Sequence, residues 1–330
     1  MSNLQKVFTD LAPDLKKIDE IILEFAVGKS PLIQEVSNHL ISSGGKRVRP
    51  ILLLLAAKLC GAKTERNHYN LAAALELIHS ATLLHDDVVD TSQIRRGKKT
   101  ANAIWDNKAS ILVGDYLFSI AFQLMVRGKN LQVLDLLAKA SSTMADGEVM
   151  QLENSSDVAL SQEKYFEIIF GKTAVLFSAA CEAGALISNV SNEQIIALRD
   201  FGKNLGTLFQ IVDDMLDYSA EQKILGKEIG ADFFEGKVTL PIILIYQKAT
   251  EEDRKFISEI FLENLHGSEK NPDNFTKIMM LMEKYHGFEA SKEAALNHHR
   301  FALNNLQNFA DSSAKQDLIA ILDYSLTRNF

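Results

Sequence analysis

Two acidic clusters stand out among the residues that could do chemistry, DDVVD at Asp86–Asp90 and DDMLD at Asp213–Asp217. On a helix, residues three and four positions apart lie on one face, so each cluster brings its carboxylates close together. Like charges at this spacing destabilise an exposed helix by about 0.2–0.5 kcal/mol per pair, and the apolar flanks of both clusters raise this cost. The clusters therefore indicate that something positively charged binds between them.

The residue types favour magnesium as that cation. Mg²⁺ binds carboxylate and phosphate oxygens and water, and proteins usually hold it with a few acids and the phosphates of a substrate. The chain has no H-x-x-E-H spacing for zinc, and His79 and His85 have too few neighbours of the right type for such a site. A single acidic cluster fits a solvated helix face equally well. Two clusters of one pattern, each within an apolar helix, weaken that interpretation.

Basic residues that could bind a phosphate group occur in two segments. Lys46, Arg47 and Arg49 cluster in GGKRVRP, where a glycine-ended loop leads into a predicted helix. The segment is not a P-loop, because GxxxxGK is absent, but exposed backbone at a helix start and a fork of basic side chains suit a diphosphate. Arg95 and Arg96 follow the first acidic cluster, and a planar guanidinium group binds phosphate oxygens in pairs. Basic residues near a helix junction are usually just solvated, so GGKRVRP alone is weak evidence.

Three lysines stand beside glycines: Lys172 in GKTAVLF, and Lys227 and Lys237 in GKEIGADFFEGKVTLP. Glycine allows a ligand to approach the backbone, although the same residues also suit ordinary turns. Lys172 differs from the other two because its predicted helix is otherwise apolar for several turns.

The elements that must position these residues are predicted to be long α-helices. None of the five prolines falls between Pro50 and Pro241, and proline breaks helices. Pro50 itself suits the first turn of a helix. Apolar residues recur at three- and four-residue intervals, as at Leu71, Leu75 and Ile78, whereas strand-like alternation is rare.

Local signals predict where several helices begin and end. A capping box at Ser191 precedes the helix that contains the second acidic cluster, and Ser161 caps the helix that contains Lys172. Gly44–Gly45 ends one helix, and His266–Asn274 has the composition of a surface loop. Because no repeat, low-complexity tract or linker divides the chain, we predict one all-α domain over residues 1–330.

Composition and charge are those of an ordinary soluble globular protein, with 47% apolar and 24% charged residues. The net charge of −8 argues against nucleic-acid binding, which needs a basic face. Cys60 and Cys181 are too few for a disulfide framework and are predicted to be small buried hydrophobic residues, in keeping with a cytoplasmic location. The N-terminus has no signal or transit pattern, and the apolar run Pro50–Ala62 is too short to span a bilayer, so we expect any membrane contact to be peripheral.

Taken together, these residues resemble the trans-type polyprenyl diphosphate synthase family. The motifs that carry the resemblance follow the family's order and spacing between Gly44 and Pro241: GGKRVRP, IHSATLLHDDVVD, RRG, GKTA, FQIVDDMLD and GKEIGADFFEGKVTLP. The paired aspartate motifs are highly specific in this company, and the isolated lysines are not. The resemblance implies an all-α, single-domain helical bundle around a deep apolar cavity, normally in a homodimer.

The resemblance also implies roles for individual residues. Two or three Mg²⁺ ions that bridge an allylic diphosphate would be bound by Asp86, Asp87, Asp90, Asp213 and Asp217. The same diphosphate would be held by Arg95, Lys172 and Lys227, with Gln210 nearby, and Thr173 and Lys237 are further expected substrate-binding residues. The diphosphate of isopentenyl diphosphate would be bound by Lys46, Arg49, His79 and Arg96. Without the resemblance, His79 fits a satisfied core histidine better.

The chemistry implied by the resemblance follows from charge. Breaking the allylic C–O bond places negative charge on the leaving diphosphate, which metal ions and fixed cations stabilise. The double bond of isopentenyl diphosphate attacks the allylic cation, and loss of a proton to the released diphosphate gives a chain one isoprene unit longer. No nucleophilic serine or cysteine is needed. The groups expected to be catalytic are Asp86, Asp87, Asp90, Lys172, Asp213 and Lys227.

Product length is set in this family by bulk below the first aspartate motif. Ala81 and Thr82, the fifth and fourth residues before Asp86, are both small. Short-chain members typically have an aromatic residue there, or two extra residues inside the motif. Ile78 and Ala74 continue the same stripe, so that about 18 Å of helix separates Asp86 from Ala74.

The floor of the cavity is expected in the following helix, at Met125 or Phe122, although ordinary core packing explains either residue as well. We therefore expect a product of about 40 to 50 carbons, as in family members that make quinone side chains, with farnesyl diphosphate as the primer. The main alternative is a short-chain synthase with a product of about 15 or 20 carbons, because only Ala81 and Thr82 argue against it.

Two other functions account for less of the sequence. A terpene cyclase or head-to-head synthase also has an aspartate-rich helix, but cyclases usually have an Asn/Asp-Ser-Glu pattern as the second metal motif, where this chain has DDMLD. A non-catalytic subunit of a synthase tends to have lost an aspartate motif or the basic residues, and all of these are present here.

Overall fold

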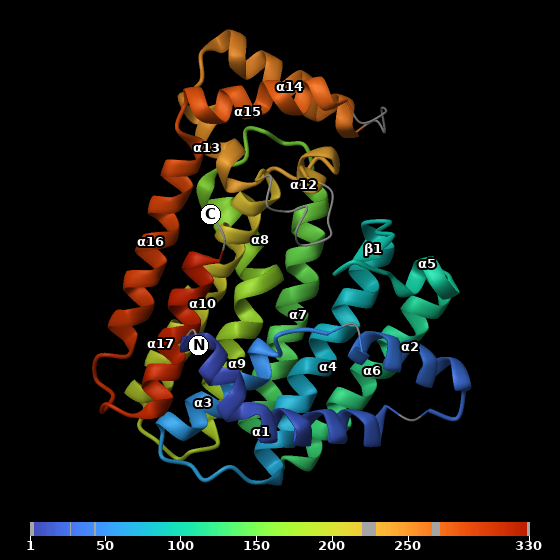
Figure 1. Cartoon of the computed structure of the whole chain (residues 1–330), viewed down its shortest axis with the longest axis vertical. Helices are drawn as coiled ribbons and strands as arrows, with labels where there is room; N and C mark the ends of the chain where they lie inside the picture. The colour runs from blue at the N-terminus through green and yellow to red at the C-terminus, as the bar shows by residue number, and fades with distance from the viewer. Residues whose placement is uncertain (1–2, 27, 43, 220–228, 266–270, 329–330) are drawn as a thin grey trace.

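The computed structural model describes residues 3–26, 28–42, 44–219, 229–265 and 271–328, and within them the chain is almost entirely helical (Figure 1). The helices in chain order are α1 (Asn3–Phe25), α2 (Pro31–Ser42), α3 (Val48–Leu59), α4 (Arg66–Val89), α5 (Ala101–Trp105), α6 (Asn107–Arg127), α7 (Leu131–Glu153), α8 (Gln162–Ile169), the π-helical turn η1 (Phe170–Ala174), α9 (Val175–Leu186), α10 (Asn192–Asp217), α12 (Ala231–Phe234), α13 (Leu240–Lys248), α14 (Glu251–Leu265), α15 (Pro272–Lys284), α16 (Gly287–Asn305) and α17 (Ser313–Thr327). The predicted all-α fold is confirmed.

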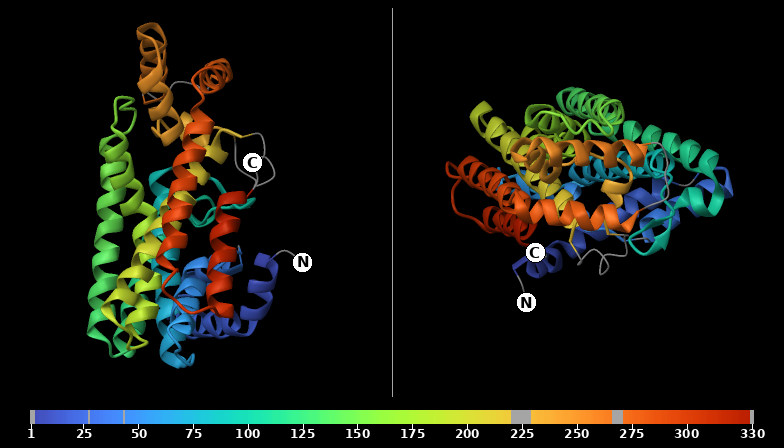
Figure 2. Two further views of the ribbon diagram at one scale, coloured as in Figure 1. Left: turned by 90° about the vertical axis from the view of Figure 1, so that its left-hand side faces the viewer. Right: turned by 90° about the horizontal axis from the view of Figure 1, so that it is seen from above.

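The long helices lie side by side around one apolar core. Helices α4, α7, α10 and α16 run roughly along the long axis of the molecule, and α14 and α15 lie across one end of it (Figures 1 and 2). Helix α4 packs against α3 and α6, and α10 packs against α9 and α16. A continuous cluster of buried apolar residues extends from Val7 in α1 to Leu322 in α17. The core thus holds α4 and α10, the helices that end in the two acidic clusters.

The predicted helix boundaries are largely confirmed. The hydroxyl of Ser191 accepts a hydrogen bond from the backbone N–H of Gln194, and the Gln194 side chain accepts one from the N–H of Ser191, which completes the capping box of α10. Ser161 accepts a backbone hydrogen bond at the start of α8. Helix α2 ends just before Gly44, whose φ is +75°, and α3 begins two residues before Pro50.

The helix predicted after Ser161 is not uniform, because η1 interrupts it between α8 and α9. Here Gly171 meets Gly147 of α7, and the two backbones are so close that a Cβ on Gly147 would lie 2.6 Å from the backbone N of Lys172. Such π-helical turns are rare and frequently occur at functional sites. The turn contains Lys172, the lysine that the sequence singles out.

A short β-ribbon occurs where the sequence has no strand pattern. Strands β1 (Ile94–Arg95) and β2 (Lys98–Lys99) pair antiparallel, with Arg95 opposite Lys98. The two residues between them, Arg96 and Gly97, have φ of +52° and +74°, as a tight hairpin turn requires. A two-residue strand is too short for alternation to reveal. The ribbon projects both predicted arginines beside the end of α4.

Two further predictions need correction. The loop predicted over His266–Asn274 is too long, because α15 begins at Pro272; residues 266–270 of that loop lie outside the described residues. Cys181 is buried as predicted, whereas Cys60 is only partly buried. Burial raises the pKa of the Cys60 thiol to about 11, so that it stays protonated at neutral pH.

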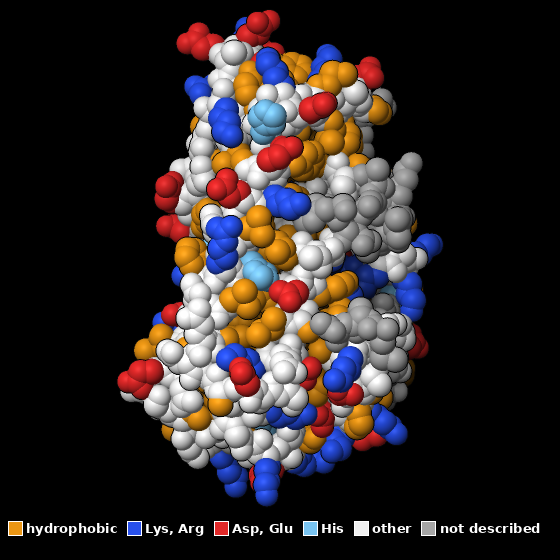
Figure 3. Space-filling view, turned by 60° about the vertical axis from the view of Figure 1, so that its left-hand side comes forward, with side chains coloured by type: hydrophobic (Ala, Val, Ile, Leu, Met, Phe, Trp, Pro, Cys, Tyr) orange, Lys and Arg blue, Asp and Glu red, His pale blue; other side chains and the backbone are white. Residues whose placement is uncertain are grey.

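Within the described part of the chain, two helical segments are long and apolar enough to cross a membrane by length and composition alone, Asn107–Arg127 and Gln162–Leu186. The fold buries 83% of the apolar window of Gln162–Leu186 but only 50% of that of α6. Core packing therefore accounts for the apolar segment Gln162–Leu186, whereas α6 keeps an apolar face exposed. The face in Figure 3 mixes acidic, basic and apolar side chains and has no basic stripe.

Candidate active site

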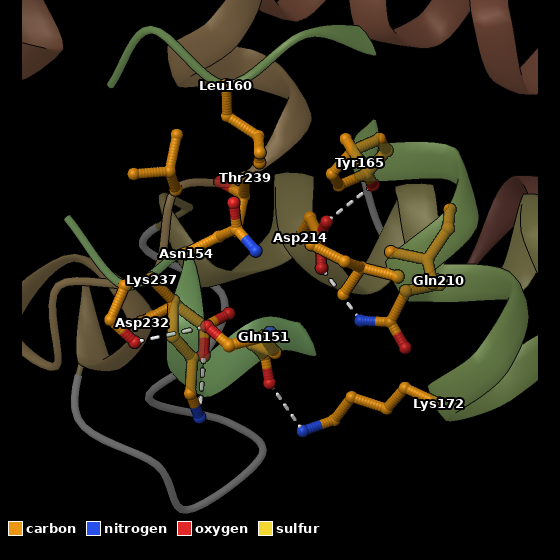
Figure 4. Close-up of a pocket in the computed structure, with 14 residues that line it drawn as sticks. Gln151, Asn154, Leu160, Tyr165, Lys172, Gln210, Asp214, Asp232, Lys237 and Thr239 are labelled. Atoms are coloured by element: carbon orange, nitrogen blue, oxygen red, sulfur yellow. Dashed lines mark hydrogen bonds and ion pairs between the residues drawn. The ribbon is translucent and has the colours of Figure 1, made fainter. Parts of the chain in front are cut away.

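The two acidic clusters lie at the C-terminal ends of α4 and α10, and the segment around α12 connects them. Lys237 Nζ lies 3.2 Å from Asp90 Oδ2 in the first cluster and 3.8 Å from Asp232 Oδ1. The backbone N–H of Asp232 donates to Asp217 Oδ2 in the second cluster at 3.0 Å. A hollow lies beside the second cluster, and its lining includes Gln151, Lys172, Gln210, Asp214, Asp232 and Lys237 (Figure 4). Lys237 links this hollow to the first cluster through Asp90. The predicted acids and lysines therefore meet at one site.

In the first cluster, the acids differ in how their charge is balanced. Asp87 is buried, and both Nε and Nη2 of Arg95 lie 2.8 Å from its Oδ1. Burial and the charge of Glu148 raise the pKa of Asp86 to about 7, and the charge of Lys172 offsets this only in part. The Asp86 carboxylate thus lacks sufficient positive charge nearby.

Lys172 reaches the hollow from the π-helical turn. Its Nζ donates to Glu148 Oε2 and to Gln151 Oε1, each at 2.8 Å, and the second contact is drawn in Figure 4. The close crossing of Gly147 and Gly171 brings η1 against α7, so the ammonium group can reach two side chains of that helix. Lys172 is therefore held at the first cluster before any ligand binds.

In the second cluster, Asp214 is the acid at the centre of a buried hydrogen-bond network. Its carboxylate accepts from the Tyr165 hydroxyl at 2.6 Å and from Gln210 Nε2 at 2.7 Å, as Figure 4 shows. Gln210 Oε1 accepts from Thr173 Oγ1 at 2.7 Å. Burial and the charge of Asp232 raise the pKa of Asp214 to about 7 despite these hydrogen bonds. The predicted residues Gln210 and Thr173 are thus tied to the second cluster.

The other two acids of the second cluster face different partners. Asp217 is buried and faces α12, as described above. Asp213 has a side chain 44% exposed and pairs with Arg328 Nη2 at 2.8 Å. The Arg328 guanidinium also lies over the ring of Phe209, 3.6 Å from its centroid, and donates to the Phe209 carbonyl. In the described residues, no three acidic, histidine or cysteine side chains converge closely enough to hold a metal ion.

The donor set nevertheless fits a divalent cation. The predicted ligands are all carboxylates, and Mg²⁺ commonly takes one or two carboxylates and fills its other positions with water and substrate phosphates. Burial and the charge of Glu148 raise the pKa of Asp86, so a cation bound there would stabilise its charged form. Carboxylates on two separate helices, α4 and α10, suit ions that are shared with a phosphate ligand better than an all-protein cage.

A second hollow lies on the other side of the ribbon, and its lining includes Gly44, Arg47, Glu76, Asp87, Arg95 and Arg96. Arg96 donates to the carbonyl of Gly44. Burial lowers the pKa of Arg96, and the neighbouring Arg95 and Arg47 lower it further, while the charge of Glu76 opposes them. This hollow therefore has an excess of positive charge.

Three residues predicted to bind isopentenyl diphosphate, Arg49, His79 and Lys46, lie near this hollow and differ in their contacts and charge. Arg49 stacks on Phe177, 4.7 Å from the ring centroid, and its buried Nε has no hydrogen-bond partner among the described residues. Burial and the charge of Arg49 hold the pKa of His79 well below its usual value, so His79 is neutral. Lys46 instead contacts Tyr324 of α17, bonding its hydroxyl and lying 4.2 Å from the ring centroid. Lys227, predicted for the allylic site, lies outside the described residues.

The residues predicted to control product length are partly in the expected place. Ala81, Ile78 and Met125 are buried, and Thr82 donates to the carbonyl of His79. Phe122 is the exception: its side chain is 37% exposed on α6, where it packs edge-on against Phe118. Met125 is buried one turn further along α6, so the structure favours Met125 over Phe122 as a group inside this chain. The deep apolar cavity itself stays a prediction.

Five residues at the site were not predicted, namely Glu148, Gln151, Tyr165, Asp232 and Arg328. Glu148 and Gln151 stand one helical turn apart in GEVMQ, so their spacing signals a shared polar face that could have been matched to Lys172. Arg328, at the C-terminal end, has no such signal, because only the tertiary structure brings α17 to α10.

Comparison with known proteins identifies the family. The family model described as polyprenyl synthetase matches residues 30–279. An octaprenyl diphosphate synthase from Haemophilus influenzae is 37% identical over 318 residues, which cover 96% of this chain and 95% of that protein. The relatives also include a geranylgeranyl diphosphate synthase from Sulfolobus acidocaldarius, 31% identical over 95% of this chain and 94% of that protein.

Solved structures of similar proteins have the same fold. A decaprenyl diphosphate synthase from Rhodobacter capsulatus superposes with a TM-score of 0.92 and 42% identity, over 98% of this chain and 99% of that chain. A polyprenyl synthase from Caulobacter crescentus CB15, complexed with calcium and isoprenyl diphosphate, has a TM-score of 0.92 and 39% identity over 98% of both chains. The chain therefore belongs to the polyprenyl synthetase family, and it is a prenyltransferase.

Proposed function

We propose that this enzyme extends an allylic diphosphate with isopentenyl diphosphate to an all-trans polyprenyl diphosphate of about 40 to 50 carbons, with farnesyl diphosphate as its primer. The observation that carries the proposal is the pair of adjoining hollows, one rich in acids and lysines and the other rich in arginines. Similar proteins named octaprenyl and decaprenyl diphosphate synthase support the long product. A role in making quinone side chains would follow from that length.

The acidic hollow is the proposed site of the allylic diphosphate. Two or three Mg²⁺ ions would be held by Asp86, Asp87, Asp90, Asp213 and Asp217, and when bound they would neutralise charge on the leaving diphosphate. Lys172, Lys237 and Lys227 would bind the remaining phosphate oxygens. Gln210 and Thr173 would keep the second cluster in place through Asp214.

The arginine-rich hollow is the proposed site of isopentenyl diphosphate. Arg49 has a buried N–H group free for an anion, Lys46 is exposed on the loop before α3, and Arg96 is exposed in the turn of the ribbon, where it contacts Gly44 of that loop. His79 is neutral, so it would donate one ring N–H to a phosphate oxygen without adding charge. The double bond of the bound molecule would attack the allylic cation, and the released diphosphate would take the proton that is lost.

The small side chains below the first cluster support the long product. Ala81 and Thr82 are both small, so a bulky group is absent at the position where it would stop elongation earliest. Met125 is the remaining candidate for the floor. A product of about 15 or 20 carbons is the alternative, which the geranylgeranyl diphosphate synthase among the relatives favours.

We also propose that the enzyme is a homodimer formed through α6. Ile111, Leu112, Phe122 and Val126 are large apolar residues that stay exposed on this helix, and monomeric proteins rarely leave such a stripe uncovered. L112E should convert the dimer to a monomer in size-exclusion chromatography with light scattering.

A cytoplasmic location with peripheral membrane contact would suit an insoluble product, and vesicle co-sedimentation tests that contact.

One experiment tests the proposed reaction. Purified protein is incubated with Mg²⁺, farnesyl diphosphate and labelled isopentenyl diphosphate, and the extracted products are separated by chain length. We expect incorporation that requires Mg²⁺, with products clustered at about 40 to 50 carbons. Products that stop at about 20 carbons would establish the short-chain alternative, and no incorporation at all would refute the reaction.

A further inference from the structure

We propose that Glu76 is a positioning residue for isopentenyl diphosphate, which acts by holding Arg47 and through it the loop that carries Lys46 and Arg49. The inference rests on the proposed function. An acid lines the hollow that should bind a diphosphate, and at first sight it would repel that ligand. Its contacts explain why it is there.

Glu76 lies on α4, in the wall of the arginine-rich hollow. It is only 6% exposed, so its charge is poorly screened by water. Its Oε1 lies 2.5 Å from Arg47 Nη1. A carboxylate at this depth is stable only when it is paired, and Arg47 supplies the pair.

Arg47 is held from two sides. Besides the contact with Glu76, its Nη2 lies 3.3 Å from Asp19 Oδ1 of α1, and its side chain is only 12% exposed. Both ends of its guanidinium group are thus occupied by acids. Of the three cations in GGKRVRP, Arg47 is the one that is not available to a phosphate group.

The backbone of Arg47 shows why its side chain must be held. Arg47 precedes α3 with φ of +47° and ψ of +38°, the left-handed conformation that residues with a Cβ adopt rarely. Such a conformation persists only when surrounding contacts enforce it. Because Lys46 and Arg49 lie on either side of this residue, the pairing of Arg47 with Glu76 determines where both side chains point.

Glu76 also balances the charge of the cluster. Its negative charge favours the protonated forms of Arg49 and Arg96, while burial and the neighbouring arginines act against them. Without it, the arginines around the hollow would repel one another and move apart. The acid therefore keeps several cations together at a distance that suits one diphosphate.

This proposal and a purely electrostatic role predict opposite results. If Glu76 contributed only charge, its removal would make the hollow more positive and would strengthen diphosphate binding. If Glu76 positions the cations, its removal weakens binding although the net charge has become more favourable. The sign of the change in affinity decides between them.

The test compares E76Q with the unaltered enzyme in steady-state kinetics and in calorimetric binding of isopentenyl diphosphate. We expect E76Q to raise the KM and Kd for isopentenyl diphosphate by about tenfold or more, because breaking a buried charge pair leaves Arg47 without a partner. The KM for farnesyl diphosphate should change by less than about twofold, since that substrate binds in the other hollow. A general loss of structure would raise both constants.

Matched variants complete the test. R47M should reproduce the E76Q effect, and the double variant should be no worse than the more damaging single one, because both remove the same contact. D135N is the control: it removes one acid from an exposed pair with Lys139, which has an N–O distance of 2.7 Å, and should leave both KM values unchanged. If E76Q does not fold, D19N removes only the outer partner of Arg47 and should raise the KM for isopentenyl diphosphate by about two- to threefold.

The outcomes separate the inference from the proposed function. An unaltered enzyme that incorporates no isopentenyl diphosphate would refute the proposed function. An active enzyme in which E76Q binds isopentenyl diphosphate as well as before, or more tightly, would refute the positioning role alone. For D19N, an unchanged KM for isopentenyl diphosphate would have the same meaning.

Discussion

The two hollows of the active site carry opposite imbalances of charge. In the acidic clusters of α4 and α10, burial and neighbouring acids raise the pKa of both Asp86 and Asp214 to about 7. On the side of the ribbon, burial and the neighbouring Arg95 and Arg47 lower the pKa of Arg96, and burial lowers that of Arg49 to about 10. The acids would therefore be stabilised by the proposed metal ions, and the arginines by a diphosphate.

The difference lies in how each side is held without ligand. In the acidic hollow, lysines from η1 and from the segment after α12 lie between the acids and keep them apart. In the arginine-rich hollow, the buried acid Glu76 holds Arg47, and the buried acid Asp87 holds Arg95. Removing an acid from the first cluster should thus stabilise the protein in the absence of ligand. Removing Glu76 from the arginine-rich hollow should instead weaken ligand binding.

The largest effect is expected for D86N. Loss of this carboxylate should lower kcat by about 10³-fold, because charge on the leaving diphosphate is no longer stabilised there. In the absence of metal, the same variant should melt at a higher temperature than the unaltered protein. A lower melting temperature without metal would contradict the charge imbalance described above.

The pH dependence of that stabilisation has a definite sign. The folded protein binds a proton at Asp86 up to a pKa of about 7, above the ordinary value of 3.8, so the folded state holds more protons than the unfolded state between these values. Asp86 therefore leaves the fold unaffected below this range and destabilises it progressively as the pH rises to about 7. The difference in melting temperature between D86N and the unaltered protein, both without metal, should grow from pH 5 to about pH 8. A difference that does not change with pH would contradict this account.

A smaller loss, of about 10²-fold in kcat, is expected for K172M. The variant removes the cation that lies between Glu148 and the first cluster, so the KM for farnesyl diphosphate should rise while that for isopentenyl diphosphate stays the same. This is the reverse of the pattern expected for E76Q. K139M, which breaks an exposed pair with Asp135 on α7, is the control and should behave like the unaltered enzyme. Equal changes in both KM values would show that the hollows are not independent.

The sequence predicted the acids and bases of these hollows but not how they pair. Spacing alone predicted that the acids of each cluster share one helix face, because helical periodicity reports which residues lie together. It placed both clusters within helices, whereas they lie at the C-terminal ends of α4 and α10. The family resemblance gave substrate-binding roles to Lys46 and Arg49 but none to Arg47, and a motif does not reveal which of three cations meets a buried acid from a distant helix. The contact with Glu76 depends on the packing of α3 against α4.

Local geometry was equally hard to foresee. The π-helical turn at Lys172 arises where two glycines on different helices meet, and no pattern within one helix signals such a crossing. The choice between Met125 and Phe122 was open for a related reason: both residues are apolar, and only the packing of α6 decides which one is buried. Capping residues, by contrast, were predicted correctly because they act within a few residues of themselves.

A substitution on α4 before the first acidic cluster should change the length of the product without changing the charges of either hollow. A81Y places a phenol ring at a fully buried alanine on α4, one turn before the first cluster, where it should block the growing chain. We expect products to shorten from about 40 to 50 carbons to about 15 to 20, with little change in either KM. Product chromatography with farnesyl or geranyl diphosphate as primer measures this. If A81Y gave the same product distribution as the unaltered enzyme, product length would not be set below the first cluster.

The smallest effect is expected for R328A, and it tests how a C-terminal residue takes part in the acidic hollow. Arg328 pairs with Asp213, the most exposed acid of the second cluster, so the pair should contribute only about 0.2–1 kcal/mol. Because the guanidinium group competes with a metal ion for that carboxylate, its removal should lower the Mg²⁺ concentration needed for half-maximal rate by about two- to threefold. R300A, a change to an arginine on α16 that bonds only Asn297, should leave that concentration unchanged. A higher Mg²⁺ requirement in R328A, or a raised KM for either diphosphate, would instead mean that Arg328 binds substrate. The charge missing from the acidic hollow would then be supplied in part by the protein's own last helix.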